Sequence, residues 1–228
     1  MEAKKKKALA GKQASDTQLL AQVLGYAVIL GSTIYKLPQI VRIHRARSAQ
    51  GISLLTSSLD AANHLFSMAY SFGNRHPLSA YGENVPQFLS MCAIVLQILR
   101  YQHRATLVSL ATCGGAMLAV AGAACAAPSL LGERLGHAAL RAMKASTMAV
   151  SLTGSLPQVL QNWKAQSVGE LSLTTTSLGL LGSWVRMYTI LKQLAEDRKM
   201  VAAQAMAVLT NSTLVLQIVM YSRRGLAS

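Results

Sequence analysis

The sequence predicts an all-α polytopic membrane protein with seven transmembrane helices. Of its 228 residues, 52% are hydrophobic and only 13% are charged, whereas a soluble domain carries about 25% charged residues. Its mean hydropathy is +0.34. Four windows contain no Asp, Glu, Lys or Arg: residues 19–35, 107–127, 145–163 and 201–221. A helix needs about 20 mainly apolar residues to cross a bilayer, and each window is long enough.

Seven helical spans account for the apolar segments in chain order. We expect them at residues 18–42, 52–73, 84–101, 105–127, 141–163, 170–191 and 200–221. The first, fourth, fifth and seventh contain the charge-free windows. The second, third and sixth are less apolar because Asp60, Glu83 and Arg186 lie in or beside them. The connections are short, so neighbouring helices must run antiparallel, and no extramembrane domain has room to fold.

The ends of the chain are polar. Residues 1–17 form a Lys-rich tail without the apolar core and small-residue cleavage site of a signal peptide. We expect a solvated tail, with contact to anionic lipid headgroups as the alternative. The formal net charge is +14. This charge flanks the spans and lacks an aromatic-studded groove, so we expect no nucleic-acid partner.

An internal repeat connects the two halves of the sequence. With a shift of 119 residues, positions 36–59 align with 155–178, and ten of twenty-four residues are identical, including a Pro-Gln pair. With a shift of 120, "VLQILRY" (95–101) aligns with "VLQIVMY" (215–221). Helices 1–3 therefore correspond to helices 5–7.

The unmatched fourth helix determines the orientation of the copies. Because three is odd, a second triplet joined directly would insert upside down, and one extra span restores the same orientation. The sequence therefore predicts a parallel 3+1+3 repeat: a triplet over 18–101, a linker helix within 102–135, a second triplet over 136–222 and a tail at 223–228. Transporters are commonly built from such repeats, with the substrate site between them.

Each copy carries a Pro-Gln pair within its first helix. Pro38 and Pro157 lack an amide hydrogen, so the carbonyls four residues earlier lose their helical partners and the helix is expected to kink. The freed carbonyl needs another donor in lipid, and Gln39 and Gln158 carry suitable amides. We predict that the two pairs are hinges, with a static packing kink as the alternative.

The paired motifs resemble a known superfamily. The duplicated Pro-Gln helices are similar to the PQ-loop family, which includes the SWEET-type sugar transporters, and imply its SWEET-like fold. "HPLSAYGE" (76–83), "GSWVRMYTILKQLAED" (182–197) and "VLTNSTLVLQIVMY" (208–221) resemble the family of mannose-P-dolichol utilization defect 1 proteins, over roughly residues 20–222. That resemblance implies use of dolichyl-phosphate-mannose and dolichyl-phosphate-glucose at the endoplasmic reticulum, hence a role in lipid-linked oligosaccharide, N-glycan and GPI-anchor assembly.

Charge in the loops predicts the orientation. Loops 1–2, 3–4 and 5–6 and the C-terminus hold eight of the Lys and Arg residues near spans: Arg42, Arg45, Arg47, Arg100, Arg104, Lys164, Arg223 and Arg224. The opposite side is more acidic, so the basic side should be cytoplasmic. This places the C-terminus in the cytosol and the N-terminus in the lumen, although the lysines of the N-terminal tail oppose it.

Polar residues within or beside spans are candidate ligand contacts because they are costly in lipid. The candidates are Asp60, Asn63, Glu83, Arg186 and Asn211. Under the repeat shifts, Asp60 aligns with Gly179, Arg186 with Ser67, and Asn211 with Met91. A pocket between the triplets would thus be chemically uneven. We expect Arg186 to bind the phosphate of a dolichyl-phosphate sugar, and Asp60, Asn63 and Asn211 to bind its hydroxyls.

The alternative to ligand binding is that these residues have structural roles. Arg186 would then form a salt bridge with Glu83, which begins helix 3 on the same side, and Asn211 would bond a neighbouring backbone. We expect Arg141 and Lys144, near the start of the fifth span, to extend their charges to the interface. His64 is either a proton-coupling group or an ordinary packing residue.

No metal or cofactor site and no nucleophile–base arrangement is apparent, so the sequence does not predict an enzyme. Three functions remain open: a protein that moves or presents dolichyl-phosphate sugars, a SWEET-like or PQ-loop transporter of small sugars or cationic amino acids, and a scaffold for glycosyltransferases. Cys92, Cys113 and Cys125 all fall inside spans and do not indicate a disulfide framework.

Overall fold

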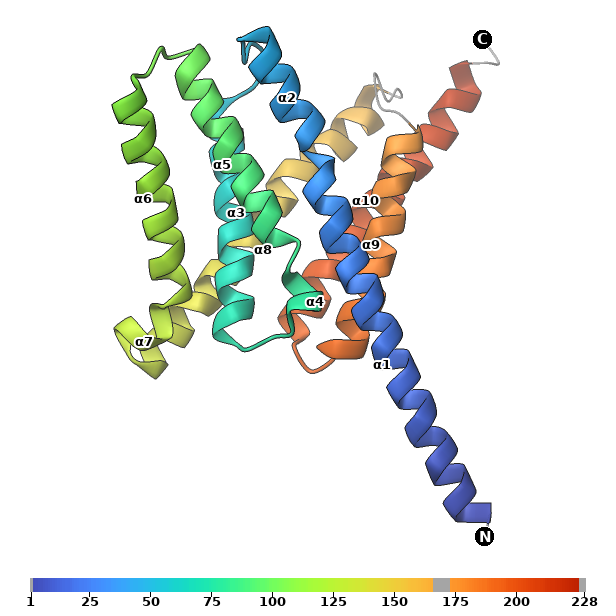
Figure 1. Ribbon diagram of the computed structural model, residues 1–228. Helices are drawn as coiled ribbons and strands as arrows, with labels where there is room; N and C mark the ends of the chain where they lie inside the picture. The colour runs from blue at the N-terminus through green and yellow to red at the C-terminus, as the bar shows by residue number, and fades with distance from the viewer. Residues whose placement is uncertain (1, 166–172, 226–228) are drawn as a thin grey trace. The chain divides into compact units, whose positions relative to one another are not determined.

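The computed structural model describes residues 2–165 and 173–225, with side chains except at 2–14, 35, 151–158, 165, 174–175 and 222–225. Throughout these ranges the only regular elements are helices. They are α1 Glu2–Tyr35, α2 Leu37–Ala46, α3 Leu54–Gly73, α4 Leu78–Tyr81, α5 Asn84–Tyr101, α6 Leu107–Cys125, α7 Ala127–Leu131, α8 Glu133–Ala165, α9 Leu173–Gln193 and α10 Arg198–Gly225 (Figure 1).

Every predicted span corresponds to a long helix. α1 and α2 together form the first span, and α3, α5, α6, α8, α9 and α10 form the others in order. Among the described residues, three stretches are long and apolar enough to cross a membrane by composition alone: Ser15–Ala46, Leu107–Cys125 and Arg198–Tyr221. Other helices are less apolar; α3, for example, carries Asp60 and His64.

The chain divides into two compact units. The first-repeat unit is Ala27–Val150, and the second-repeat unit combines Met1–Tyr26 with Ser151–Ser228. The division falls inside α1 and α8, whereas the sequence-based boundaries lie between helices. α2, α3, α5 and α6 lie wholly in the first-repeat unit and α9 and α10 wholly in the second-repeat unit, whereas α1 and α8 are divided between the two.

In the first-repeat unit, α3 packs on both α5 and α6, and α2 packs on α5. Figure 1 shows α6 beside α3 and α5. The core is apolar, with Leu65, Ile94 and Ile98 buried. Two helix starts are capped by side chains: Ser53 accepts from the amide of Thr56, and Thr106 from the amide of Ser109. Hydroxyl caps of this kind satisfy amides that have no intrahelical partner.

In the second-repeat unit, α9 and α10 pack against each other (Figure 1). α10 buries the equivalents of three of the seven residues that α5 buries in the first copy. Under the 120-residue shift, Phe88, Ile94 and Ile98 correspond to Val208, Leu214 and Ile218, and all six are buried. The third helix of each triplet therefore turns the same face inward.

Candidate functional site

The two Pro-Gln segments have different backbones. α1 ends at Tyr35 and α2 starts at Leu37, with Lys36 between them and Pro38 in the first turn of α2. α8, by contrast, runs as one helix from Glu133 to Ala165, through position 157. The side chains of Pro157 and Gln158 lie outside the described residues. The hinge role of both pairs stays a prediction.

A glutamine from the third helix of each triplet reaches the residue that follows the Pro-Gln pair. Gln97 Nε2 donates to the carbonyl of Ile40 at 3.1 Å, and Gln217 Nε2 donates to the carbonyl of Val159 at 2.9 Å. The two glutamines correspond under the 120-residue shift and the two acceptors under the 119-residue shift. The same helix 3 to helix 1 bond thus occurs in both copies, and we call it the glutamine clamp.

The second clamp has an additional member. Asn162 Nδ2 donates to Gln217 Oε1 at 3.1 Å, and both residues are buried, at 8% and 4% exposure. The equivalent of Asn162 in the first copy is Ile43, which is buried but apolar. Gln97 Oε1 is buried without a hydrogen-bond partner among the described residues. Sequence analysis missed both clamps, although the repeated "VLQI" contained the signal.

A second polar link joins helices 2 and 3 of the first triplet. His64 Nδ1 lies 3.2 Å from Asn84 Oδ1, and Asn84 Nδ2 donates to the carbonyl of Tyr81 at 2.9 Å. The amide nitrogen of Asn84 donates to the Tyr81 carbonyl, so the side-chain oxygen of Asn84 faces His64. An amide oxygen only accepts, so the donor in this contact is the N–H at His64 Nδ1. Neutral His64 therefore retains Nε2 as an acceptor. Burial raises the pKa of the nearby Tyr81 phenol, which stays neutral.

The second triplet links the same positions with other residues. Ser183 and Gln204 are the repeat equivalents of His64 and Asn84. Gln204 Nε2 donates to the Ser183 carbonyl at 2.8 Å, and Asn211 Nδ2 donates to Ser183 Oγ at 2.7 Å. The structural alternative was that Asn211 bonds to a neighbouring backbone. Asn211 does make a hydrogen bond to a neighbouring helix, but its acceptor is the Ser183 hydroxyl and not a backbone group. The Asn211 carbonyl oxygen remains an acceptor.

Lys36 and Asp60 carry opposite charges within the first-repeat unit. Lys36 lies at the interruption between α1 and α2, and Asp60 lies on α3, one turn before His64. Both charges are absent from the second copy, where Ser155 and Gly179 occupy the equivalent positions. Sequence analysis overlooked Lys36, although it lies inside the predicted first span. Next to this pair, Asn63 Oδ1 is buried and has no hydrogen-bond partner in the described chain.

Arg186 lies in the middle of α9 and is buried, with 6% exposure. Its carbonyl accepts from Thr189 Oγ1 at 2.8 Å. Glu83 precedes α5 and is half-buried. The second-repeat unit thus contains a buried guanidinium. The first-repeat unit contains Lys36, Asp60, His64 and Asn63.

Lys144 is a further buried cation. We predicted that it would extend to the membrane interface, but it is only 6% exposed, and its Nζ lies 6.0 Å from the centroid of the Tyr70 ring. α8 begins at Glu133, eight residues before the predicted start, so Lys144 lies about 16 Å along the helix. Arg141 is exposed, as a snorkelling residue would be.

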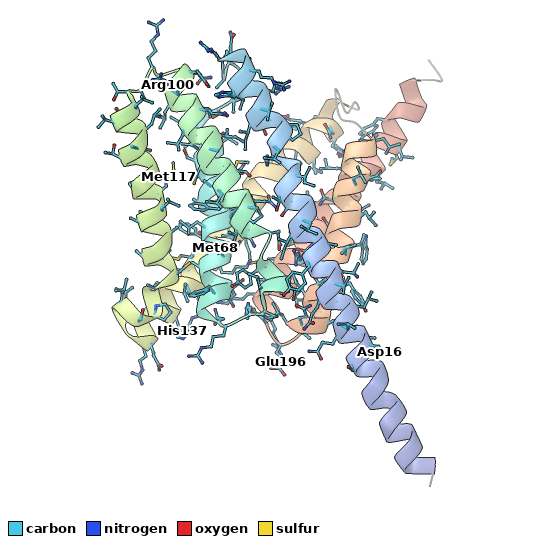
Figure 2. All side chains as sticks on the ribbon, viewed as in Figure 1. Asp16, Met68, Arg100, Met117, His137 and Glu196 are labelled. Carbon is cyan, nitrogen blue, oxygen red and sulfur yellow. The ribbon has the colours of Figure 1, made fainter. Side chains whose placement is uncertain are left out.

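Charge is concentrated at one end of the first-repeat unit. Arg42, Arg45 and Arg47 at the end of α2 are exposed, as are Arg100 and Arg104 around the α5–α6 turn. The C-terminal ends of α2 and α5 lie close together here, since Tyr101 Oη of α5 lies 3.1 Å from His44 Nδ1 of α2. Figure 2 shows Arg100 at this end, His137 at the opposite end, and Met68 and Met117 between. The orientation of the chain in its membrane stays a prediction.

The described residues contain no cluster of three or more His, Cys, Asp or Glu side chains suited to a metal ion. The three cysteines are free thiols, Cys92 buried and the other two half-buried. The polar side chains of the two units are suited to hydrogen bonding and to binding charged groups.

Comparison with known proteins agrees with this arrangement. A PQ loop repeat model matches residues 20–80 and 141–197, which together exceed half of the chain. The structure is similar to that of a eukaryotic SWEET transporter, with a TM-score of 0.66 at 14% identity, over 92% of this chain and 99% of that one.

These matches define a class of polytopic helical membrane proteins with a duplicated repeat. The chain belongs to the PQ-loop repeat family. The predicted fold class, seven helices in a parallel 3+1+3 SWEET-like repeat, is confirmed.

Proposed function

We propose that this chain is an endoplasmic reticulum protein that moves or presents a dolichyl-phosphate-linked mannose or glucose for lipid-linked oligosaccharide, N-glycan and GPI-anchor assembly. The observation that carries the proposal is Arg186, a guanidinium buried within a membrane-spanning helix of one triplet only. Guanidinium stays charged and binds phosphate through two parallel hydrogen bonds. A lipid-linked sugar phosphate presents such a group at membrane depth.

Acceptors on the described side chains suit the hydroxyl groups of a sugar. Asn63 Oδ1 is buried and lacks a donor among the described residues, and a buried acceptor left unsatisfied costs about 1–3 kcal/mol. The Asp60 carboxylate and the Asn211 carbonyl oxygen are further acceptors. A sugar hydroxyl would satisfy each of them. The polyprenyl chain requires no polar partner and would remain among lipid tails.

The segments that resemble the mannose-P-dolichol utilization defect 1 family contain Glu83, Arg186 and Asn211. This resemblance is what selects a lipid-linked sugar over other phosphates. It also supports residence in the endoplasmic reticulum membrane, with the basic loops in the cytosol and the N-terminus in the lumen.

A second candidate is a transporter of small sugars or cationic amino acids. It is favoured by the similarity to a eukaryotic SWEET transporter over nearly the whole chain. Under this alternative the ligand contacts of the two triplets should resemble each other. They differ instead, because Arg186, Asn211 and Asp60 have no equivalents in the other copy.

Replacing Arg186 with Gln is expected to reduce function strongly. The chain should restore full-length lipid-linked oligosaccharide to cells that accumulate the truncated form, and R186Q should reduce this restoration by about 10-fold to 100-fold, the value of a charged hydrogen bond. Chromatography of the labelled oligosaccharides measures the effect. Lys192→Gln, an exposed cation on the same helix, is the matched control and should retain activity.

The structural alternative has its own test. If Arg186 serves only to neutralise Glu83, the E83Q/R186Q double variant should regain the activity that R186Q loses. The phosphate role predicts that the double variant stays inactive. Failure of the unaltered chain to restore the oligosaccharide would overturn the proposed function itself.

A further inference from the structure

Exposed arginines gather at one end of the first-repeat unit, on α2 and its C-terminal cap and around the end of α5. We call them the arginine cluster: Arg42, Arg45, Arg47, Arg100 and Arg104. The stretches 36–59 and 84–132, which contain the cluster and most of the unit's helices, have no Asp or Glu. Glu83 and Glu133 precede α5 and α8, at the opposite end of these helices. This end of the unit is therefore cationic, with no acid beside it in either stretch.

The two turns that carry the cluster are bonded to each other. The Gln102 side chain donates to the carbonyl of Ala49, and Tyr101 Oη lies 3.1 Å from His44 Nδ1. Figure 1 shows the end of α2 and the α5–α6 connection at the same end of the unit. The guanidinium groups therefore share one surface.

Most of the cluster is available to a ligand. Arg100 Nη1 donates to the Ala105 carbonyl at 3.1 Å, which closes the turn between α5 and α6. The other four make no hydrogen bond or ion pair in the part of the chain that the structure describes: Arg42, Arg45, Arg47 and Arg104. A helix C-terminus favours a cation, but these four side chains bond no carbonyl there. Their guanidinium donors remain free for an anion.

The choice of arginine points to phosphate. Lysine and arginine serve membrane orientation alike, and the N-terminal tail uses lysines alone. Guanidinium differs in its planar fork of donors, which binds phosphate through two parallel hydrogen bonds. Arg47 and Arg104 even have left-handed backbones, with φ of 47° and 52°, a conformation that Gly or Asn adopts more readily. Neither orientation nor turn geometry explains an arginine at these positions, whereas phosphate binding does.

Exposed apolar side chains adjoin the cluster and indicate its depth. Val41 directly precedes Arg42, and Leu107 and Val108 begin α6 about one turn after Arg104. Leu107 and Val108 are 72% and 73% exposed, as lipid-facing residues are. The cluster thus lies where a span meets water, which is the depth of lipid headgroups. Lipid phosphates are the abundant anions there, so a lipid fits this surface better than an acidic protein does.

We propose that the arginine cluster binds an anionic lipid whose headgroup ends in a phosphomonoester, the chemistry of phosphatidic acid. A phosphomonoester carries about 1.5 to 2 negative charges and three acceptor oxygens, enough for guanidinium groups from both turns. A phosphodiester headgroup offers one charge. The site involves residues of the first-repeat unit alone and does not rest on the proposed function.

Titration of the purified full chain in neutral detergent with short-chain phosphatidic acid tests the proposal. The unaltered chain should prefer it to phosphatidylcholine of the same chain length by at least about fivefold, and R45Q/R104Q should bind it about 25-fold more weakly, since each cation near an anionic surface is worth about fivefold. R45K/R104K keeps the charge and should still lose about threefold to tenfold, the value of one hydrogen bond. The matched control is R134Q/R141Q, which removes two exposed cations after α7 and should bind as the unaltered chain does.

Several results would overturn the proposal: equal binding of the two lipids, unchanged binding by R45K/R104K, or equal losses in R45Q/R104Q and R134Q/R141Q. Glycerol 3-phosphate that competes as well as phosphatidic acid would assign the site to a soluble phosphate, and tighter binding of a polyglutamate peptide would assign it to a protein. Elution on size-exclusion chromatography checks that each variant is folded. Should R45Q/R104Q fail this check, R104Q alone, with an expected loss of about fivefold, decides the matter. No dolichyl lipid is present, so the result stands apart from the proposed function.

Discussion

Replacing Asp60 with Asn is expected to destabilise the protein by about 2 kcal/mol, and replacing Lys36 with Met in addition is expected to restore most of the loss. An ionised side chain at the centre of a span costs about 2.5–3.5 kcal/mol. Lys36 is half-buried, so the cost of removing the opposite charge of Asp60 should lie below that range. For a chain of this size the loss corresponds to a fall in Tm of about 4–8 °C.

Thermal unfolding of the purified protein in detergent measures this effect. Glu196→Gln removes an acid from an exposed position and should leave the Tm unchanged. The second copy shows that the uncharged combination is compatible with the fold, since Ser155 and Gly179 occupy the equivalent positions. A K36M/D60N double variant no more stable than D60N would show that the two charges do not act as a pair.

Replacing Gly136 with Ala is expected to disrupt the junction between α7 and α8. The added Cβ would overlap the Cα of Pro128, and it would lie 2.7 Å from the carbonyl oxygen of Ala127 and 2.8 Å from the Pro128 nitrogen. All three are backbone atoms, which cannot rotate aside as a side chain can. Overpacking a tight site costs about 1–3 kcal/mol, and we expect about 3 kcal/mol here.

The same substitution elsewhere provides the control. Gly122 in α6 has nothing within 4 Å of the position of an added Cβ, so Gly122→Ala should be neutral or slightly stabilising. The yield of monodisperse protein on size-exclusion chromatography and the Tm would separate the two variants. Equal values for both would show that the close approach of α7 to α8 is not required.

The sequence predicted the helices well because the determining property is local. Apolar length is enough to define a span, so seven segments were located without any knowledge of packing. The copies were detectable because "LPQ" and "VLQI" recur at nearly constant spacing. Residues 84–101 were even predicted with the bounds of α5.

Contacts between helices were harder to predict because they depend on how each helix is rotated. Gln97 and Gln217 reach the Pro-Gln segments only because α5 and α10 turn that face inward, and a one-residue change in position rotates a side chain by about 100°. Lys144 was placed at the interface because the start of α8 was predicted eight residues late. Lys36 was missed because a single lysine directly after the charge-free window 19–35 is also typical of a residue that extends its charge to the membrane interface.

The most direct measurement of the central claim is transbilayer movement of dolichyl-phosphate-mannose in proteoliposomes containing the full chain. We predict movement with the unaltered protein, loss of movement with Arg186→Gln, and background uptake of a water-soluble monosaccharide. Uptake of the soluble sugar without movement of the lipid-linked one would contradict the account.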